Sequence, residues 1–346
     1  MGRVQAWGVT EAGAPVQALE IERREPGVRD VVVDIDFCGV CHSDIHTARG
    51  EWGSPMLPLV TGHEIVGRVV ATGQQVTRFR VGERVGVGVI VDSCGDCEAC
   101  NAGFENYCHN GNVGTYNSRM RGTGEPTLGG YSTSIVVDER FVLRVPESLD
   151  PAAAAPLLCA GITLWSPLRH WNAGPGTRVA VMGLGGLGHM GVKLAHALGA
   201  HVTVLSHSAG KREQALALGA DDFISTSDAE QMRNARYAFD LILNTVSAEL
   251  DINEYIKLLT WNGTLVILGL PGAPLSVNAG GLMDRRRSLS ASGIGGMTET
   301  QEMLDFCGEH GIVSEIERIA PSYINQSWDR VVASDVRYRF VIDIKG

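Results

Sequence analysis

The chain has 346 residues, of which 44% are hydrophobic, and carries a formal net charge of −10. This length normally makes two domains, and the apolar content is enough for two cores. The acidic balance, without a basic cluster interleaved with aromatic residues, argues against a nucleic-acid partner. We find neither an apolar run as long as a membrane span nor the apolar core of a signal peptide. We therefore expect a cytoplasmic protein that binds no membrane.

The first 150 residues consist of short runs rich in β-branched residues, and glycine-containing turns separate these runs. Examples are residues 30–36, 65–70 and 84–91. This pattern is typical of an antiparallel, partly closed β-barrel. From residue 151, the sequence Pro-Ala-Ala-Ala-Ala-Pro opens a helical connector, which leads to an isolated cysteine at position 159.

Four cysteines lie close together within the β-rich part, and their spacing is Cys-x2-Cys-x2-Cys-x7-Cys. They are Cys94, Cys97, Cys100 and Cys108. Four thiolates converging on one ion are typical of a structural zinc site, which has no free coordination position. A disulfide framework belongs to short, cysteine-dense secreted chains, which this chain is not. An iron–sulfur cluster has similar spacing, but zinc is the favoured interpretation.

A second set of metal ligands is dispersed along the chain. Cys41 lies in Gly-Val-Cys-His-Ser-Asp, His63 in Gly-His-Glu, and Cys159 stands alone. Each of these residues by itself is more often a buried packing residue than a ligand. Together they would supply three ligands and leave a fourth position open for substrate, as in catalytic zinc sites.

A dinucleotide-binding motif begins near the middle of the chain. Residues 178–182 form a predicted strand, which ends at a glycine-rich turn before an apolar-periodic helix. The motif residues are Gly183, Leu184, Gly185, Gly186, Leu187 and Gly188. Such glycines permit a tight turn, close approach of a pyrophosphate and close packing of helix on strand.

The end of the next predicted strand, 201–205, indicates which dinucleotide binds. An NAD enzyme usually has a carboxylate here, and residues 206–212 contain none. Ser206, Ser208 and Lys211 instead suit a 2′-phosphate, so the sequence predicts NADP(H). Further strands at 223–225, 239–244 and 263–269 alternate with helices, which predicts a parallel sheet covered on both faces.

The chain as a whole resembles the zinc-dependent medium-chain alcohol dehydrogenases, in their cinnamyl alcohol dehydrogenase branch. It is most similar to the bacterial NADP-dependent members with broad specificity. The matching segments are residues 39–44, 62–64, 91–108, 183–188, 206–211, 299–305 and 335–341.

The resemblance implies an α/β fold of two domains. A GroES-like, β-rich catalytic domain would comprise residues 1–151 and 293–346, and a Rossmann doubly wound parallel-sheet domain would comprise residues 152–292. The return of the chain to its first domain is implied by the resemblance alone. The family also implies a homo-oligomer, a dimer or tetramer, with a contact through residues 263–269 and the segment that follows.

The resemblance also assigns roles to individual residues. Cys41, His63 and Cys159 match the catalytic zinc ligands. Ser43 and His46 match a proton relay, Asp44 the carboxylate that orients His63, and Glu64 an acidic neighbour of the metal, for which a surface salt bridge is the alternative. Looser matches place the following residues along the cofactor: Thr163, Thr245, Gly269, Ser292, Gly293 and Ile294. Trp52, Leu57 and Ile294 match an apolar substrate pocket.

The predicted function is interconversion of primary alcohols and aldehydes with apolar bodies, aromatic or medium-chain aliphatic. Hydride passes to or from NADP(H), and each chain holds one catalytic and one structural zinc. Plant members carry bulky aromatic residues where this chain has Gly114 and Gly293, which indicates a roomier pocket. The alternatives are a polyol or secondary-alcohol dehydrogenase of the same fold, and a non-catalytic zinc- and NADP-binding redox sensor.

Overall fold

The computed structural model describes residues 2–346, which form two compact units. The first contains the chain up to Ile162 together with Gly295–Gly346, and the second is Thr163–Ile294. The units divide later in the chain than the domain boundaries expected at 151 and 292. The boundaries at 151 and 292 stay a prediction about the catalytic and dinucleotide-binding domains. The two units are defined by packing contacts alone.

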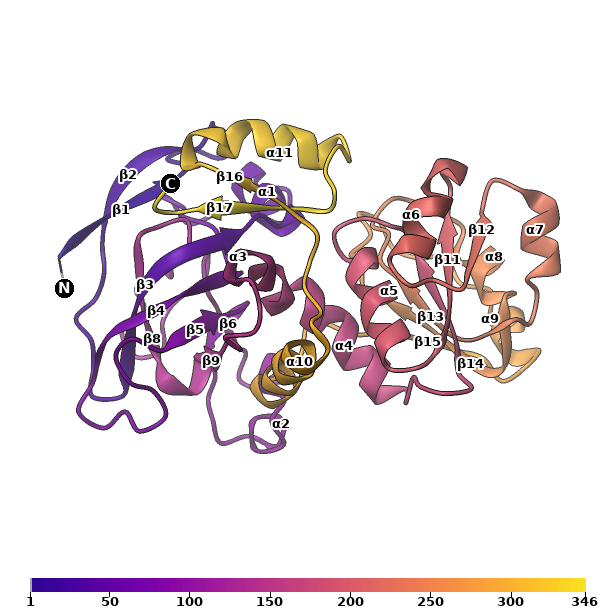
Figure 1. The fold of residues 1–346 in the computed structure, drawn as a ribbon, viewed down its shortest axis with the longest axis horizontal. Helices are drawn as coiled ribbons and strands as arrows, with labels where there is room; N and C mark the ends of the chain where they lie inside the picture. The colour runs from indigo at the N-terminus through magenta and orange to yellow at the C-terminus, as the bar shows by residue number, and fades with distance from the viewer. Residues whose placement is uncertain (1) are drawn as a thin grey trace. The chain divides into compact units, whose positions relative to one another are not determined.

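A seven-stranded sheet forms the centre of the first unit (Figure 1). Six strands follow the order β16-β17-β3-β4-β5-β9, and β8 pairs with β3 off this path. All neighbouring strands are antiparallel except β16 and β17. The bounds are β3 Asp30–Gly39, β4 Ile65–Thr72, β5 Arg84–Val87, β8 Ser134–Asp138, β9 Leu143–Arg144, β16 Ile316–Ile319 and β17 Arg339–Asp343.

Short elements surround this sheet in the first unit. Two strand pairs are β1 Arg3–Gly8 with β2 Gln17–Glu22, and β6 Ile90–Asp92 with β7 Val113–Gly114. The helices and 3-10 turns before the connector are α1 His42–Arg49, α2 Glu98–Asn101, η1 Glu105–Tyr107 and η2 Glu139–Phe141. The run 84–91, expected as one strand, is two strands that pair with different partners. Gly88 lies at the break, where its carbonyl accepts a hydrogen bond from Thr115 Oγ1 at 2.5 Å.

The connector after β9 is helical, as predicted, and is interrupted at its cysteine. The Asp150 side chain caps α3 (Pro151–Ala154) by accepting from the amide of Ala153, and Pro151 occupies the first turn, where no N–H is needed. The 3-10 helix η3 (Ala155–Leu158) and α4 (Ala160–His170) follow, with Cys159 between them. Among the described residues, no single helix is long and apolar enough to cross a membrane. The bent pair Pro151–Leu158 and Ala160–His170 is long and apolar enough when its two helices are taken together. Most of its side chains are buried inside the protein.

The second unit is a six-stranded parallel sheet in the order β12-β11-β10-β13-β14-β15. Its strands are β10 Arg178–Met182, β11 His201–Ser206, β12 Asp222–Ser225, β13 Phe239–Asn244, β14 Leu259–Ile267 and β15 Ser288–Ala291. The intervening helices are α5 Gly188–Ala197, η4 Ala209–Lys211, α6 Arg212–Ala217, α7 Ala229–Asn234, α8 Ile252–Ile256 and α9 Ala279–Met283. Strand order reverses between β10 and β13, so right-handed crossovers put helices on both faces. The predicted doubly wound fold is confirmed.

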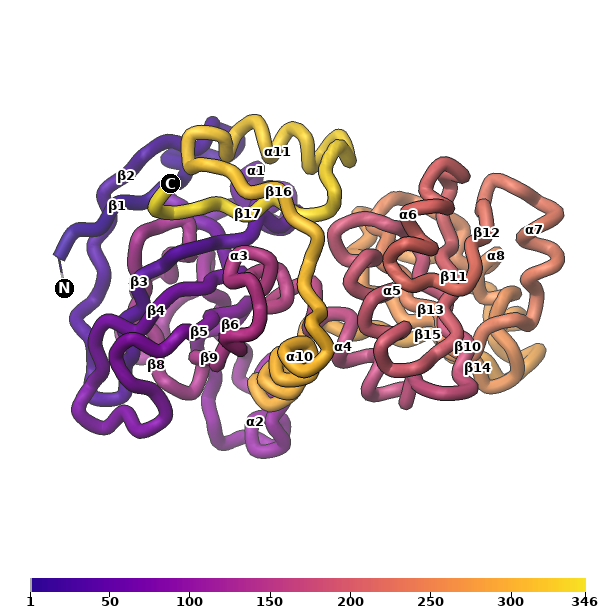
Figure 2. Tube along the Cα trace, in the orientation of Figure 1, coloured from indigo at the N-terminus to yellow at the C-terminus, as the bar shows by residue number. Residues whose placement is uncertain are grey.

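The chain then returns to the first unit, as the resemblance implied. The returning elements are α10 Met297–His310, β16, η5 Pro321–Tyr323, α11 Ile324–Val332 and β17. Figure 2 shows this C-terminal segment running beside the N-terminal strands of the same unit. β17 pairs antiparallel with β3, with Val341 opposite Gly39. This pairing brings Arg339, at the start of β17, to the region that follows β3.

Candidate functional site

The four closely spaced cysteines form one cluster, in which all four sulfur atoms lie within 4.8 Å of one another. The Sγ atoms of Cys94 and Cys100 are 3.9 Å apart. A disulfide requires about 2.05 Å, whereas Zn–S bonds of about 2.3 Å in a tetrahedron put the sulfur atoms about 3.8 Å apart. All eight cysteines of the chain are free thiols. The cluster therefore fits zinc and does not fit a disulfide.

Backbone amides of the same segment point at these sulfur atoms. The amide of Cys94 donates to Cys108 Sγ, and that of His109 donates to Cys97 Sγ, both at 3.4 Å. Hydrogen bonds from the amides of Cys100 and His109 lower the pKa of Cys97 to about 6. Because donors to sulfur stabilise the thiolate, the segment is prepared to bind a metal ion.

A second cluster joins Cys41, His63, Glu64 and Cys159. Their ligand atoms all lie within 4.8 Å of one another, and all four residues are buried. The Sγ atoms of Cys41 and Cys159 are 3.9 Å apart, again the edge of a zinc tetrahedron. Nε2 of His63 is buried and has no hydrogen-bond partner among the described residues. An orphaned imidazole nitrogen beside two thiols fits a metal ligand.

Three separate parts of the first unit supply these ligands. Cys41 is the N-cap of α1, directly after β3. His63 and Glu64 immediately precede β4, and Cys159 follows η3. The two thiols interact closely, and a hydrogen bond from Cys159 lowers the pKa of Cys41 well below its usual value. The prediction that these distant residues meet agrees with this geometry.

Asp44 contacts two of the ligand residues, Cys41 and His63. Its carboxylate is fully buried, and Oδ1 lies 3.5 Å from Nδ1 of His63. Oδ2 accepts from the amide of Cys41 at 2.9 Å and from the hydroxyl of Tyr131 at 3.0 Å. Burial lowers the pKa of His63, but the hydrogen bond with Asp44 and the negative charges of Asp44 and Cys41 outweigh it and raise the pKa to about 10. These surroundings favour a cation at Nε2, where a metal ion would take the place of the proton. Asp44 thus fixes the orientation of His63 with Nε2 left for a metal.

Tyr131 was not foreseen from the sequence, and it offers a test of this support. We expect Tyr131→Phe to destabilise the protein by about 1.5–3 kcal/mol, because it removes a buried hydrogen bond to a carboxylate. Tyr237→Phe, on the exposed surface of the second unit, should change stability by less than about 0.5 kcal/mol. Denaturant unfolding of both variants measures the difference. Equal stabilities would show that the Tyr131 hydroxyl contributes nothing to holding Asp44.

Glu64 forms a buried ion pair with Arg339, a residue that the sequence analysis missed. Both side chains are almost fully buried, so the alternative of a surface salt bridge is wrong. Oε2 of Glu64 has no hydrogen-bond partner among the described residues. A Cβ on Gly39 would lie 1.9 Å from this oxygen, which explains why glycine stands there. Arg339 thus holds Glu64 within the metal cluster, with one carboxylate oxygen unpaired.

The proposed relay residues lie on α1. Ser43 is half-buried and forms a hydrogen bond with Tyr116. Burial and nearby negative charges raise the pKa of Tyr116 well above its usual value, and the bond with Ser43 offsets only part of this. Tyr116 thus stays protonated beside Ser43, and its ring lies 5.6 Å from that of His63. His46 is also half-buried; it contacts Glu51 through Nδ1, and its ring stacks between His42 and Trp52. Tyr116 and Glu51 were not foreseen from the sequence.

The glycine motif of the second unit forms the turn between β10 and α5. Gly183 has φ +87°, a conformation that favours glycine, and a Cβ on Gly188 would lie 2.0 Å from the carbonyl oxygen of Gly183. A Cβ on Gly185 would meet nothing within 4 Å. The turn is thus closed on its helix side and open at Gly185, as a pyrophosphate requires. Leu184, Gly186 and Leu187 complete the turn.

The residues expected around a 2′-phosphate gather at the end of β11. Ser206 is buried, and its Oγ accepts from the amide of Ser208 at 3.3 Å. Nζ of Lys211 donates to the carbonyl of Leu184 at 3.0 Å, which places the ammonium group over the glycine turn. Arg212 instead donates to the carbonyl of Phe223 and stacks over its ring, so its guanidinium group is directed toward β12.

The remaining cofactor candidates lie in the same unit. Thr245 donates from Oγ1 to the carbonyl of Met182 at 2.6 Å, which binds the end of β13 to the end of β10. A Cβ on Gly269 would lie 2.7 Å from the backbone of Val246. Thr163 is buried at the start of the unit, and Ser292, Gly293 and Ile294 end it. Their role in cofactor binding stays a prediction.

Comparison with known proteins identifies the family. The model of the alcohol dehydrogenase GroES-like domain matches residues 27–147, and that of the zinc-binding dehydrogenase matches residues 186–309. The NADP-dependent alcohol dehydrogenase C of Mycobacterium tuberculosis is 58% identical over the full length of both chains. The chain is a zinc-dependent medium-chain alcohol dehydrogenase. An Escherichia coli aldehyde reductase is 52% identical over 99% of this chain and 98% of its own.

A solved structure places this alcohol dehydrogenase in the cinnamyl alcohol dehydrogenase branch. The cinnamyl alcohol dehydrogenase of Sorghum bicolor has a TM-score of 0.97 and is 44% identical, over 99% of this chain and 98% of that chain. The expected family and branch are confirmed.

The expected substrate-pocket residues of this dehydrogenase lie in two different units. Trp52 and Leu57 belong to the first unit, where they are 51% and 45% exposed. Their loop is held by Asn117, whose Oδ1 accepts from the amide of Met56 at 2.8 Å. Ile294 belongs to the second unit and has φ +46°, an unusual conformation for a β-branched residue. That these three residues line one pocket stays a prediction.

Proposed function

We propose that this protein interconverts primary alcohols and aldehydes by hydride transfer to or from NADP(H), with two zinc ions per chain. The observation that carries the proposal is the convergence of Cys41, His63 and Cys159, with an unpaired imidazole nitrogen and a thiol pair at zinc spacing. Three ligands of this kind leave one position for substrate. The four-cysteine cluster would hold the second zinc as a structural ion.

Zinc bound at the catalytic cluster supplies Lewis-acid polarisation of the substrate oxygen, and the nicotinamide accepts or gives the hydride. The residues of the chain then handle the proton. Ser43 would accept the alcohol proton while giving up its own hydroxyl proton, and His46, which is partly exposed and contacts Glu51, would release a proton to solvent. Asp44 keeps His63 in position, and Glu64 with Arg339 provides a carboxylate that adjoins the ligand set.

NADP(H) is the proposed cofactor because the end of β11 carries two serines and a lysine and no carboxylate. The M. tuberculosis relative is named as NADP-dependent, which supports the assignment. Ser206 and Ser208 would hydrogen bond with the 2′-phosphate, and Lys211 would supply the charge. The proposed pyrophosphate site is the open turn at Gly185.

The proposed substrates are aromatic and medium-chain aliphatic alcohols and aldehydes, without strict preference. The names of the M. tuberculosis and E. coli relatives cover both directions of the reaction. The proposal of a roomy pocket rests on glycine at positions 114 and 293. A Cβ on Gly293 would meet nothing within 4 Å, whereas one on Gly114 would lie 3.1 Å from Ser118 Oγ. An apolar pocket of this kind discriminates weakly between substrates of similar shape.

We also propose that the enzyme is a cytoplasmic homo-oligomer. All eight cysteines are free, which suits a reducing compartment. Large apolar side chains are exposed on the second unit, where Trp261, Leu270 and Met283 are 67%, 62% and 80% exposed. The segment 263–269 expected at the contact belongs mostly to β14, an interior strand, whereas β15 forms the edge of the sheet. The contact is therefore better assigned to β15 and these apolar side chains.

The cofactor assignment gives a direct test of function. We expect the wild type to prefer NADPH, and Lys211→Ala to weaken kcat/KM with NADPH by roughly tenfold or more, since a charge-assisted hydrogen bond contributes about 1.5–3 kcal/mol. NADH should be almost unaffected. Ser206→Asp should lower NADPH use further and raise NADH use, because a carboxylate repels the phosphate and accepts a ribose hydroxyl. Arg212→Ala is the matched control, because its guanidinium group is directed toward Phe223.

The measurement is kcat/KM with both cofactors and a panel of aldehydes, alcohols and polyols, combined with the zinc content per chain. Two zincs and turnover of primary aldehydes support the proposal. Preference for a polyol or secondary alcohol would point to a different dehydrogenase. Cofactor binding without turnover of any substrate would indicate a redox sensor. Equal losses with NADH and NADPH in both variants would show that Ser206 and Lys211 serve the fold alone.

A further inference from the structure

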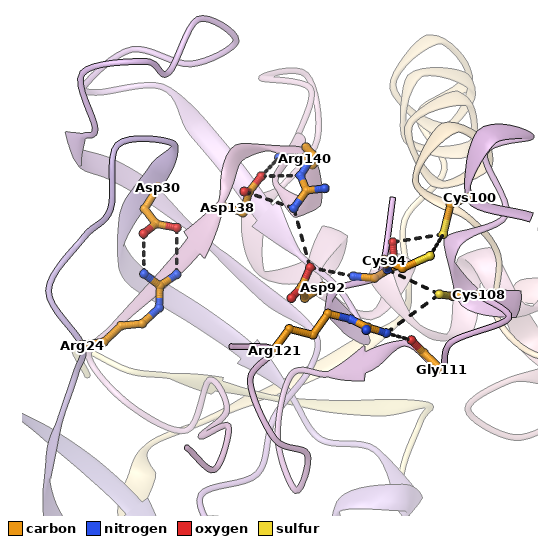
Figure 3. Close-up of polar contacts among 11 residues, drawn as sticks. Arg24, Asp30, Asp92, Cys94, Cys100, Cys108, Gly111, Arg121, Asp138 and Arg140 are labelled. Carbon is orange, nitrogen blue, oxygen red and sulfur yellow. Dashed lines mark hydrogen bonds and ion pairs between the residues drawn. The ribbon is translucent and has the colours of Figure 1, made fainter. Parts of the chain in front are cut away.

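One arginine from outside the cysteine segment reaches back to the four-cysteine cluster. The guanidinium group of Arg121 donates to the carbonyls of Asn110, at 2.9 Å, and Gly111, in the turn directly after Cys108. The same Nη2 atom lies 4.0 Å from Cys108 Sγ. Figure 3 shows Arg121 beside Cys108 and Gly111. A cation therefore contacts both a ligand sulfur atom and the backbone that positions it.

The negative charge of a zinc-bound cluster explains why a cation beside it would be stabilising. Four thiolates and one Zn²⁺ carry a net charge of about −2, and amide dipoles offset only part of it. A guanidinium group supplies a full, permanent positive charge and is weakly hydrated, so it suits a half-buried anionic site. Arg121, 4.0 Å from Cys108 Sγ, is thus placed to offset the negative charge of the zinc-bound cluster.

A second arginine near the cluster is occupied elsewhere. Arg140 makes a bidentate contact with Asp138, with Nε 2.9 Å from Oδ1, and its Nη2 is 3.6 Å from Asp92 (Figure 3). Its charge is therefore shared with two carboxylates. Within residues 2–346, no carboxylate lies within 4 Å of Arg121 in any ion pair that the structure shows, and Arg121 influences Asp92 only at longer range. Arg140 also acts on Cys100 electrostatically, but Arg121 is the one that donates to the turn after Cys108 and lies against its sulfur atom.

Arg121 sits on a hairpin whose other end reaches the catalytic cluster. Arg119 and Pro126 form a β-bridge, and the amide of Met120 donates to the carbonyl of Glu125 at 2.8 Å. A few residues earlier in the same segment, the ring of Tyr116 lies 5.6 Å from that of His63. Asn117 binds the loop of Trp52 and Leu57 through the amide of Met56. All of these residues belong to the first unit.

We propose that Arg121 is a positioning residue that compensates the charge of the structural zinc site and anchors to it the segment 113–128, which borders the catalytic cluster. The inference rests on the proposed function, because it requires zinc at the four cysteines. When that zinc is bound, the turn after Cys108 is fixed, and Arg121 fixes the hairpin to it. When zinc is lost, the hairpin loses this anchor, and Tyr116 and Asn117 lose part of their support.

The experiment compares Arg121→Gln with Arg119→Gln in the two-zinc enzyme. Arg119 is exposed, lies in the same hairpin and donates to the carbonyl of Gly124, so it is a matched control. Zinc release is followed with a coloured chelator, and the Cys100→Ser protein identifies which zinc belongs to the cysteine cluster. Arg121→Gln should release that zinc roughly tenfold faster, the usual size of an effect from residues that support metal ligands. Arg119→Gln should behave as wild type, and Arg121→Lys should lie between wild type and Arg121→Gln.

Hydrogen exchange of segment 113–128 provides the second readout. Its amides should exchange faster in Arg121→Gln than in Arg119→Gln, and faster in Cys100→Ser than in wild type. Equal zinc release and equal exchange in Arg121→Gln and Arg119→Gln would overturn the inference while leaving the proposed function intact. A wild type with no zinc at the cysteine cluster would instead overturn the two-zinc proposal. If Arg121→Gln does not fold, the test is made with Arg121→Lys. Zinc release from Arg121→Lys at the wild-type rate would then contradict the inference, because lysine cannot reproduce the paired contacts of the guanidinium group.

Discussion

Ser43→Ala is expected to keep both zincs and normal NADPH binding while turnover falls by roughly two to four orders of magnitude, the usual size of a general acid–base contribution. The hydroxyl of Ser43 is the half-buried donor and acceptor on α1 beside Tyr116. Its loss leaves the proton of a buried alcohol without an acceptor. The measurement is single-turnover kinetics, which separate the chemical step from product release.

Two further variants separate a relay from a structural role for Ser43. Ser43→Thr keeps a hydroxyl and should recover most of the turnover. His46→Ala should cost less than Ser43→Ala, because His46 is partly exposed and water can replace it. A solvent isotope effect should be present in wild type and altered in Ser43→Ala. Wild-type turnover in Ser43→Ala, with chemistry shown to be rate-limiting, would require the relay to be abandoned.

Cys100→Ser is expected to lose one zinc per chain and to lower the melting temperature, with the damage centred on residues 94–108. A structural zinc stabilises a folded peptide by about 10–16 kcal/mol in isolated fingers, so loss of one ligand removes a large local contribution. The buried sulfur of Cys100 lies 3.3 Å from Ser93 Oγ and 3.9 Å from Cys94 Sγ, so it forms one corner of the cluster. Metal analysis and calorimetry measure the two effects.

Cys307→Ser is the matched control for this variant. Cys307 is also a buried thiol, but it contacts Met303 within α10 and belongs to neither cluster. It should therefore keep both zincs, whatever its effect on the melting temperature. An unchanged melting temperature with two zincs retained in Cys100→Ser would contradict a structural role for the four-cysteine cluster.

The sequence determined those features whose residues are near neighbours in the chain. The four cysteines lie within fifteen positions, so their spacing alone places four thiols around one point. The glycine motif likewise needs only a strand, a turn and a helix in succession, and the structure has β10, the turn and α5 there. Alternation of strands and helices after residue 178 predicted the parallel sheet, which is confirmed. Local spacing carries this information because a short stretch of chain limits how far apart its residues can lie in space.

The tertiary structure alone decided which distant residues meet. Arg339 reaches Glu64 across 275 residues because β17 pairs with β3, and no periodicity in either strand specifies its partner. Tyr131 reaches Asp44 across 87 residues, and Arg121 reaches the turn after Cys108 through a hairpin whose composition is that of an ordinary loop. Cys41, His63 and Cys159 were grouped in the sequence by their residue types and matched to ligands by the resemblance, but no spacing in the chain shows that they meet. Hydrophobic patterning fixes which face of a strand is buried, whereas the pairing of strands fixes which polar side chains share that interior.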